Sequence, residues 1–407
     1  MKIKRYDFAA CAAFTAYAGC SLIIPIVLVA MGKDLNFPLD DGGMGSGGIL
    51  HLARCAAMLL SLLGCGFVAA KFGKRLPMGT ALLIMGLGIT GCAFAPGYWM
   101  LIPMLTLAGL GEGICEGLAT PFVQDLHPDN PEKHVNIAHS FWSVGISICV
   151  LGAGFMLLMG ISWRVAVFCY GLSGVLVSLC FLWKESAYNR YPENPVTQNT
   201  ADICRLSVEI CKSFRFWLFC AGMFVGAGAE FCLTFWSAAY LELTFKASPL
   251  LAGCGTAAIA AGMFVGRNFF AHIASVKNLK NILLACSLGT IPLTLMLAFL
   301  KPAHFSSPIL MFTVLLTILF LCGIGIAPYW PTLQVYGVRC LPHLDSTMLY
   351  IYFSAMGIPG CGFFTWIIGV LGDNYGLQGA FILIPATLLL YAGIILCNQL
   401  FCKKENI

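Results

Sequence analysis

Long apolar runs, separated by short polar turns, follow one another along the whole chain. Each run is long enough for one helix of about 20 residues to cross the hydrocarbon core of a bilayer. In the first half we expect such helices near residues 6–31, 46–70, 76–95, 99–124, 135–160 and 163–183. In the second half we expect them near residues 214–241, 249–274, 279–300, 307–337, 345–371 and 376–401. The pattern predicts an all-α integral membrane protein with about twelve transmembrane helices.

One long polar stretch, residues 184–213, separates the sixth run from the seventh. Its centre is rich in proline and asparagine, which favours a linker, and its end predicts a short amphipathic helix near 203–211. We therefore expect an N-terminal six-helix bundle at 1–183, a cytoplasmic linker at 184–213 and a C-terminal six-helix bundle at 214–407.

Two short patterns occur once in each half of the chain. Phe141-Trp-Ser-Val-Gly145 resembles Phe353-Ser-Ala-Met-Gly357, and Gly109-Leu-Gly111 resembles Gly323-Ile-Gly325. Together with the layout of six runs, a linker and six runs, these matches favour two pseudo-symmetric bundles. Transporters built from such repeats bind their substrate between the repeats, near the midplane of the bilayer.

Composition and charge agree with a membrane protein. Hydrophobic residues make up 59% of the chain and charged residues only 10%, against about 25% charged residues in a soluble domain. The net charge of +5 does not indicate a nucleic-acid partner, because the basic residues cluster at the ends of the apolar runs. If both termini are cytoplasmic, most of the 23 Lys and Arg residues lie on the cytoplasmic side. We expect a multi-pass protein of the bacterial inner membrane with its lipid bilayer as partner.

The first apolar run follows Lys4 and Arg5, as in a signal peptide. It continues to Met31, which is longer than the apolar core of a signal peptide. We therefore expect this run to be kept as the first span.

Several kinds of chemistry lack their sequence signals. The 20 cysteines lie mostly inside apolar runs and form no CxxC pair, so we interpret them as packing residues. The motifs HExxH, GxSxG and GxxxxGK[ST] do not occur. We expect neither an enzyme nor a cofactor nor a metal site, and we expect transport to be driven by a solute or ion gradient.

Acidic residues inside the apolar runs are the first candidates for function. Glu112 and Glu116 lie four residues apart in the fourth run and so share one helix face. A carboxylate at that depth is costly and normally faces a wet cavity or the bundle interior. Glu116 is the first candidate for proton coupling, Glu112 is its partner or the actual proton carrier, and Glu230 in the seventh run is the candidate across the cavity. For each, the alternative is a structural hydrogen bond to a neighbouring helix.

Arg54 lies within the second run, one turn after His51. It can pair with Glu112 or Glu230 as a charge lock, or clamp a carboxylate or phosphate of the substrate. It can also extend its side chain to the membrane interface. An anionic substrate is therefore one of the open hypotheses.

Aromatic and amide residues in the later runs are candidates for contacting a sugar-like solute. They are Trp142, Tyr329, Gln334 and Tyr350. Aromatic residues also form belts at membrane interfaces, which is the alternative interpretation. Arg267, near the cytoplasmic end of the eighth run, is expected to act as a gate or anchor.

The loop after the second run has a recognisable motif, Gly66-Phe-Val-Ala-Ala-Lys71-Phe-Gly73-Lys74-Arg75. It resembles the signature GxLADRxGRR of the major facilitator superfamily, with Ala70 in place of the acidic residue. The resemblance implies the major facilitator fold of two six-helix bundles. It also implies a gating role for the residues of the motif, namely Gly66, Lys71, Gly73, Lys74 and Arg75.

Within that superfamily the chain is most similar to the fucose:proton symporter family. The run from Gly109 to Phe122 resembles the fourth-helix pattern of that family and places Glu116 on a glutamate linked to sugar binding and proton handling. His139 and Trp142 stand where that family has sugar-contacting Gln and Asn in the fifth helix, and His51 stands in the place of a second-helix glutamine. The resemblance thus implies substrate contacts for these residues.

Two further positions bear on this resemblance. Gly226-Ala-Gly-Ala-Glu230 resembles a GxE pattern of sugar-type members, which implies a site role for Glu230. Ser21 stands where the family has its first-helix proton acceptor, an aspartate. Proton coupling in this chain must therefore use another carboxylate.

These observations predict a secondary active transporter that takes up a monosaccharide or sugar derivative with protons, by alternating access and as a monomer. Its partners are then a small polar solute and the proton, with no nucleic acid. The alternatives are proton-driven efflux of a drug or metabolite, uptake of an organic anion, and a receptor that does not transport. The fifth run lacks the Gly-Pro pair of many antiporters between Gly145 and Gly154, which favours uptake.

Overall fold

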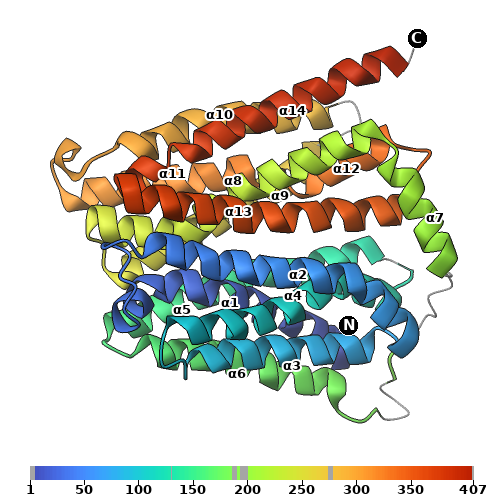
Figure 1. Cartoon of the computed structure of the whole chain (residues 1–407), viewed down its shortest axis with the longest axis horizontal. Coiled ribbons are helices and arrows are strands. Elements are labelled where there is room, and N and C mark those ends of the chain that lie inside the picture. The colour runs from blue at the N-terminus through green and yellow to red at the C-terminus, as the bar shows by residue number, and fades with distance from the viewer. Residues whose placement is uncertain (1–4, 130, 186–189, 193–199, 274–277, 406–407) are drawn as a thin grey trace. The chain divides into compact units, whose positions relative to one another are not determined.

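The computed structural model of the chain describes residues 5–129, 131–185, 190–192, 200–273 and 278–405. Within those ranges the regular elements are helices, and none is a strand (Figure 1). The helices of the first half are α1 (Arg5–Asp34), α2 (Met44–Phe72), α3 (Arg75–Cys92), α4 (Tyr98–Leu126), α5 (Pro131–Leu158) and α6 (Trp163–Leu182). They are followed by α7 (Thr200–Cys211), α8 (Phe214–Phe245), α9 (Pro249–Ile273), α10 (Leu279–Phe299), η1 (Pro302–His304), α11 (Pro308–Ile326), α12 (Pro331–Cys340), α13 (Ser346–Ala380) and α14 (Leu383–Glu405).

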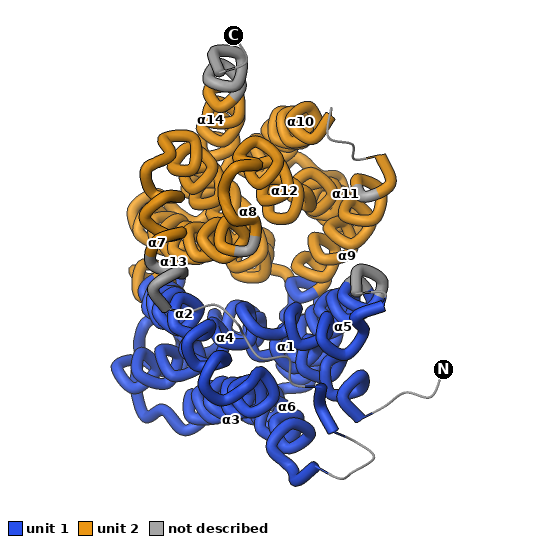
Figure 2. The backbone as a smooth tube through the Cα atoms, turned by 90° about the vertical axis from the view of Figure 1, so that its right-hand side faces the viewer, with its two compact units in different colours: residues 1–39, 49–197, 248–253 blue, residues 40–48, 198–247, 254–407 orange. Residues whose placement is uncertain are grey.

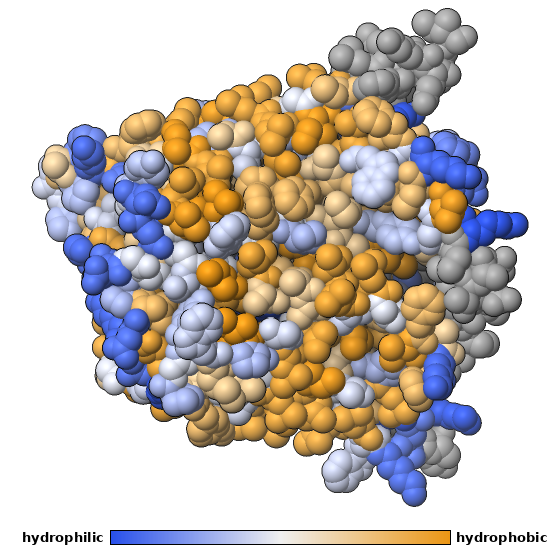
Figure 3. Space-filling model, in the orientation of Figure 1, coloured by the Kyte–Doolittle hydropathy of each residue, from blue (hydrophilic) through white to orange (hydrophobic). Residues whose placement is uncertain are grey.

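The helices have the length and composition of membrane spans. In the described part of the chain, 11 stretches are long and apolar enough to cross a membrane, and Leu383–Asn398 is a shorter apolar helix. Hydrophobic side chains cover the middle of the helices, and hydrophilic side chains gather toward their ends (Figure 3). The prediction of an all-α membrane protein with about twelve spanning helices is confirmed.

Two spans differ from the prediction in detail. The tenth span is broken, because α11 ends at Ile326 and α12 begins at Pro331. Pro328 and Pro331 lack the backbone N–H that a continuous helix needs. The eleventh span continues past residue 371, until Gly376 interrupts the helix with a φ of 75°. That left-handed conformation suits glycine, and the last span therefore starts at Leu383 rather than at residue 376.

The described residues form two compact units (Figure 2). The first unit holds residues 1–39, 49–197 and 248–253, and the second holds 40–48, 198–247 and 254–407. The start of α2 belongs to the second unit, where the Asp373 carboxylate of α13 accepts hydrogen bonds from the backbone N–H groups of Met44 and Gly45, each at 2.7 Å. The domain boundaries inferred from the polar stretch stay a prediction.

The repeated glycine pairs have the same packing role in both units. A Cβ atom at Gly109 of α4 would collide with α2, and one at Gly111 would collide with α3. Likewise, a Cβ atom at Gly323 of α11 would collide with α9, and one at Gly325 would collide with α10. Small residues let helix backbones approach closely in a membrane. The fourth helix of each half is therefore held by its second and third helices in the same way.

Candidate functional site

A stripe of glycines on α4 brings the first candidate residues together. Gly109, Gly113 and Gly117 recur every four residues, so they share one helix face, and a Cβ atom at each would collide with atoms of α2. The two backbones can approach closely only because these side chains are absent. The approach places Arg54 of α2 beside Glu112 of α4.

Arg54 and Glu112 form a closed ion pair. The Arg54 Nε donates to Glu112 Oε2 at 2.7 Å, and Nη2 pairs with Oε1. The remaining guanidinium donors reach the backbone carbonyls of Ser21 and Cys20 on α1, each at 3.0 Å. Each side chain of the pair is only 3% exposed. Of the alternatives for Arg54, the structure shows the charge pair with Glu112, and the extension of Arg54 to the membrane interface is wrong.

The two glutamates of α4 meet two residues of α1 that are also four positions apart. Ser21 donates its hydroxyl to Glu112 at 3.1 Å, and Tyr17 donates its hydroxyl to Glu116 at 3.2 Å. The position that held an aspartate in the resembled family thus hydrogen-bonds to a carboxylate on α4. Tyr17 also lies edge-on against Trp142, with ring centroids 4.6 Å apart. Glu116, unlike Glu112, is only half-buried.

His139 extends this group of rings along α5. Its side chain is exposed, its Nε2 lies 2.9 Å from the hydroxyl of Thr120, and its ring lies 4.5 Å from that of Phe14. Thr120 is one turn beyond Glu116 on α4, so the rings lie beside the glutamate. We call this group the aromatic cluster: Phe14, Tyr17, His139 and Trp142.

His51 is buried in α2, and its Nε2 lies 3.5 Å from Sγ of Cys55 on the next turn. His51 lies one turn from Arg54 on α2, whereas the residues of the aromatic cluster lie on α1 and α5. The structure therefore brings Glu116, His139 and Trp142 together, and places His51 on a different helix from that group.

The second unit holds a looser pair. Arg267 Nη2 of α9 lies 3.7 Å from Glu230 Oε1 of α8. The Glu230 side chain is 8% exposed, whereas that of Arg267 is 39% exposed. Within the described ranges, the buried atoms Glu230 Oε2 and Arg267 Nε have no hydrogen-bond partner. A buried carboxylate oxygen without a donor is unusual and costly, so this pair can accept a further donor or a proton.

A pair of tyrosines with neighbouring rings packs against α8 near Glu230 through one of those rings, that of Tyr391. A Cβ atom at Gly226, one turn before the glutamate, would meet the ring of Tyr391 at 2.7 Å. Tyr329 lies against Tyr391 with ring centroids 4.8 Å apart, and neither hydroxyl has a hydrogen-bond partner in the part of the chain that the structure describes. Sequence reasoning selected Tyr329 but missed Tyr391.

The other candidates of the second unit lie on α12 and α13. Gln334 is buried and donates to the Ser354 hydroxyl at 2.8 Å, which joins α12 to α13. Tyr350 lies on α13 and is exposed. No three His, Cys, Asp or Glu side chains of the described residues come together in a way that could hold a metal ion.

The signature motif begins in the last turns of α2 and ends at Arg75, the first residue of α3, with only Gly73 and Lys74 between the two helices. Gly73 has a φ of 73°, a conformation that favours glycine. Lys74 pairs with Asp125 at the end of α4 at 2.6 Å, and Arg75 reaches the carbonyl of Phe181. Lys71 is exposed, as is Gly66, where a Cβ atom would meet open space. Asp125 thus supplies an acidic partner for the basic loop, although Ala70 replaces the acid of the signature.

The start of the polar linker is fixed to the same end of the first unit. Tyr191 is buried, stacks on Phe122 at 4.4 Å and donates its hydroxyl to Asp125 at 2.9 Å. Glu185 accepts the backbone N–H of Tyr191 and the hydroxyl of Tyr6, each at 2.8 Å. Burial alone would raise the pKa of Glu185, but these hydrogen bonds and the nearby Arg75 hold that pKa below its ordinary value.

Sequence reasoning missed several of these residues. Tyr17 lies one helical turn before Ser21, so the helical period counted from that position could have found it. Tyr391 had no signal, because it is one tyrosine in an apolar helix and its neighbours come from distant parts of the chain.

Comparison with known proteins supports the fold. The family model of the Major Facilitator Superfamily matches residues 9–363. The niacin transporter of Acinetobacter baylyi is 27% identical over 157 residues, which cover 38% of this chain and 34% of that protein. A putative metabolite transport protein of Haemophilus influenzae is 25% identical over 285 residues, which cover 66% of this chain and 67% of that protein. The match to the niacin transporter thus spans only about a third of its length.

Solved structures share the fold at low identity. A bacterial homologue of the human lysosomal transporter Spinster, inward-facing and occupied, has a TM-score of 0.75 and 15% identity, covering 97% of this chain and 96% of that chain. A D-xylose-proton symporter has a TM-score of 0.74 and 13% identity, with coverage of 98% and 96%. The fucose:proton symporter of E. coli has a TM-score of 0.63 and 18% identity, with coverage of 96% and 98%.

The motif resemblance, the helical fold and the family model therefore agree over most of the chain. The sequence belongs to the Major Facilitator Superfamily, whose members are membrane transporters rather than enzymes.

Proposed function

We propose that this transporter takes up a small polar solute, a monosaccharide or a sugar derivative, together with protons. The observation that carries the proposal is the half-buried Glu116, hydrogen-bonded to Tyr17 and flanked by the aromatic cluster within apolar helices. The likeness to sugar-proton symporters, which is a likeness of fold alone, also favours a sugar as the solute.

The aromatic cluster has the chemistry of a sugar site. Ligand sites combine aromatic and apolar walls with a few polar groups that fix orientation. The half-buried ring of Trp142 offers a face to the C–H side of a sugar, while Glu116 and the exposed His139 offer hydrogen bonds to its hydroxyls. Glu230, Tyr329, Gln334 and Tyr350 are the proposed contacts from the second unit.

The carboxyl groups differ in how well they suit a proton carrier. The charge of Glu112 is matched by Arg54 through two hydrogen bonds, so it gains little from protonation. Glu116 is held by the neutral hydroxyl of Tyr17. An ionised carboxylate within apolar helices is costly, and protonation removes that cost. We assign proton coupling first to Glu116, then to Glu230, and the role of charge lock to Arg54 and Glu112.

Alternating access needs parts that open and close. The basic motif Gly66–Arg75 at the junction of α2 and α3, with its pair Lys74–Asp125, is the proposed gate, and Arg267 is a second charged gate residue. The proposed topology has both termini in the cytoplasm of a bacterial cell and a monomeric transporter in the inner membrane.

The test uses purified protein in proteoliposomes. A counterflow screen over sugars, sugar acids and other small metabolites first identifies a transported solute. We expect Glu116→Gln to lose uphill, proton-driven accumulation of that solute while counterflow persists, because counterflow needs no proton gradient. Glu209→Gln, which changes an exposed glutamate of α7, is the matched control and keeps both activities. Undiminished uphill uptake by Glu116→Gln contradicts the assignment, and absence of counterflow with every solute contradicts the sugar proposal.

A small organic anion is the second candidate substrate. The match to a niacin transporter favours it, since niacin is a small aromatic carboxylate. Arg54 is engaged by Glu112, so the half-exposed Arg267, loosely paired to Glu230, is the better anion ligand. Counterflow of nicotinate that is lost in Arg267→Gln, without counterflow of any sugar, would establish this candidate in place of the first.

A further inference from the structure

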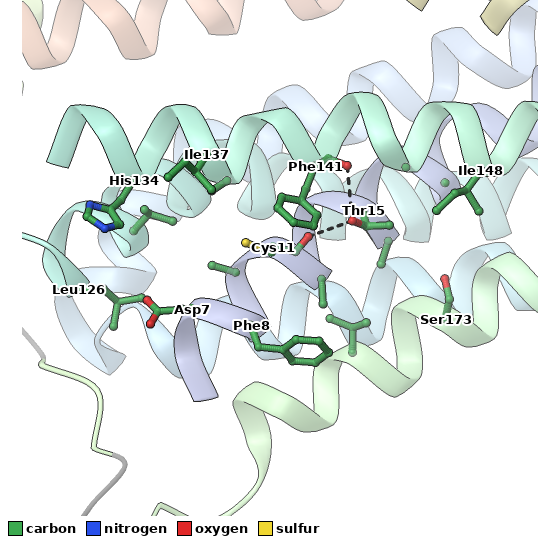
Figure 4. Close-up of a pocket in the computed structure, with 18 of the residues that line it drawn as sticks. Asp7, Phe8, Cys11, Thr15, Leu126, His134, Ile137, Phe141, Ile148 and Ser173 are labelled. Atoms are coloured by element: carbon green, nitrogen blue, oxygen red, sulfur yellow. Dashed lines mark hydrogen bonds between the residues drawn. The ribbon is translucent and has the colours of Figure 1, made fainter. Parts of the chain in front are cut away.

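A groove of about 580 Å³ lies in the first unit, away from the carboxylates of α4. Its floor is α1, and its walls are α5 and α6 (Figure 4). The residues along it are mostly apolar, among them Phe8, Ile137 and Ile148. Glu112 and Glu116 are not among the residues that line it. The groove is thus a feature separate from the proposed solute site.

Large side chains of both the floor and the walls of the groove face the surroundings of the protein. Phe8 is 61% exposed and Ile148 is 54% exposed, although both lie in helices composed to span a membrane. Large apolar side chains exposed on such helices face lipid. On the floor, Cys11 and Thr15 are half-exposed, so the groove reaches down to α1. The medium that fills it is therefore the bilayer.

The length of the groove matches one leaflet. The apolar part of the groove on α5 runs from Ile137 to Ile148 (Figure 4). These two residues are eleven positions apart, which is about 17 Å along a helix. The hydrocarbon core of a bilayer is about 30 Å thick, so the acyl chains of one leaflet span about 15 Å. One acyl chain can lie along the groove from end to end.

One end of the groove is polar. His127 Nε2 lies 2.7 Å from Asp7 Oδ1, and the rings of His127 and His134 are stacked with centroids 3.6 Å apart. Asp7 and His134 lie on either side of the same end (Figure 4). These residues come from the start of α1, the residue after α4 and the start of α5, where spans reach the membrane interface. An imidazole N–H of His134 can donate to a phosphate there. The hydrogen bond between His127 Nε2 and Asp7 orients the ring on which His134 stacks.

We infer that the groove binds one phospholipid of the surrounding bilayer. One of its acyl chains lies on α1 between α5 and α6, and its phosphate accepts a hydrogen bond from His134. The same helix α1 presents Tyr17 and Ser21 to α4. The bound lipid therefore supports the helix that holds the two glutamates in place.

The first test measures lipid retention by native mass spectrometry. Protein is incubated with dioleoylphosphatidylglycerol or with dioleoylphosphatidylethanolamine in detergent. We expect the wild type to retain one phospholipid and Cys11→Phe, which fills the floor of the groove, to retain at least five times less. Cys397→Phe makes the same change at an exposed cysteine of α14 and should retain as much as the wild type. Equal retention by Cys11→Phe and the wild type overturns the inference.

The second test addresses the phosphate and does not depend on folding of the groove-filling variant. Wild-type protein in vesicles that contain a phospholipid with a photoreactive acyl chain should be labelled on peptides of α1, α5 and α6. In native mass spectrometry, His134→Leu should lower retention of both phospholipids, while retention of dioleoylglycerol, which lacks the phosphate, stays as in the wild type. Labelling that falls evenly on all spans, or equal wild-type retention of dioleoylglycerol and phospholipid, contradicts the inference.

Discussion

Among the residues that the structure describes, each unit of this transporter holds an Arg–Glu pair between neighbouring helices, and the two pairs differ in burial and in distance. In the first unit, Arg54 and Glu112 are both almost fully buried and joined by two hydrogen bonds. In the second unit, Arg267 is more than a third exposed and lies 3.7 Å from Glu230. We call the buried pair Arg54–Glu112 the sealed pair and the partly exposed pair Arg267–Glu230 the open pair. The same two residue types thus form a sealed pair in one unit and an open pair in the other.

Packing around the pairs explains the difference. In the first unit a glycine at every fourth position of α4 lets α2 approach, and two carbonyls of α1 take the remaining guanidinium donors of Arg54. In the second unit Glu230 keeps one buried oxygen without a donor among the described residues. A sealed pair stabilises helix positions, whereas an open pair can exchange its partner for a proton or a ligand. We therefore expect structural effects from the first pair and functional effects from the second.

Arg54→Gln tests the sealed pair and should have the largest effect on stability. It leaves the Glu112 carboxylate buried without its matching charge, and breaking a buried pair in this way costs about 3–5 kcal/mol. We expect a clear fall in the melting temperature of the purified protein in detergent. The double variant Arg54→Gln, Glu112→Gln should recover part of that fall, because no uncompensated charge remains. A single variant that melts like the wild type contradicts the description of the pair as sealed.

Gly109→Ala tests the packing that creates the sealed pair. The new methyl group would collide with the backbone of α2, and overpacking of this kind costs about 1–3 kcal/mol. The equivalent change in the second unit, Gly323→Ala, should lower the melting temperature by a similar amount, because a methyl group there collides with α9. Gly393→Ala adds a methyl group in open space and is the control, with no loss expected. Loss in only one unit would show that the packing is not shared.

Arg267→Gln should lower the melting temperature less than Arg54→Gln or Gly109→Ala does. A pair with an exposed partner contributes about 0–1 kcal/mol, so the melting temperature should move by less than a third of the shift seen for Arg54→Gln. The transport rate should nevertheless change clearly in this variant, since this pair is the open one. Equal melting shifts for the two arginine variants would remove the distinction between the pairs.

A pH effect at the linker should be the smallest. The pKa of Glu185 is held below its ordinary value, so its ionised form stabilises the docked linker at neutral pH. That contribution is complete above the ordinary pKa of a glutamate and is lost as pH falls through the lowered one. Limited proteolysis of the linker should become faster as the pH falls from 5 to 3, because protonation of Glu185 weakens its contacts with Tyr6 and Tyr191. In Glu185→Gln the rate should no longer depend on pH in this way; an unchanged dependence contradicts the role of this carboxylate.

Much of the fold followed from the sequence, because spans are set by length and hydropathy alone. Details that depend on single backbone positions did not follow. The proline-bounded break at Pro328–Pro331 lies in a run of apolar residues, so hydropathy predicted one continuous span. The interruption of the eleventh span at Gly376, beyond its predicted end at residue 371, depends on a positive φ that hydropathy does not report.

Only part of the candidate site could be predicted from the sequence. Spacing predicted that Glu112 and Glu116 share a face, and both contact α1. Spacing could not choose between Glu112 and Glu230 as the partner of Arg54, because that choice depends on which helices approach each other. The roles assigned to these residues stay predictions that transport measurements must test.

Proton movement during transport shows most directly whether Glu116 carries the proton. A pH-sensitive dye is enclosed in weakly buffered proteoliposomes, and the transported solute is added outside. Solute entry should acidify the interior with wild-type protein and with Glu209→Gln. With Glu116→Gln, labelled solute should still enter the proteoliposomes, but without acidification. Acidification of the same size with Glu116→Gln would contradict the assignment of proton coupling to Glu116.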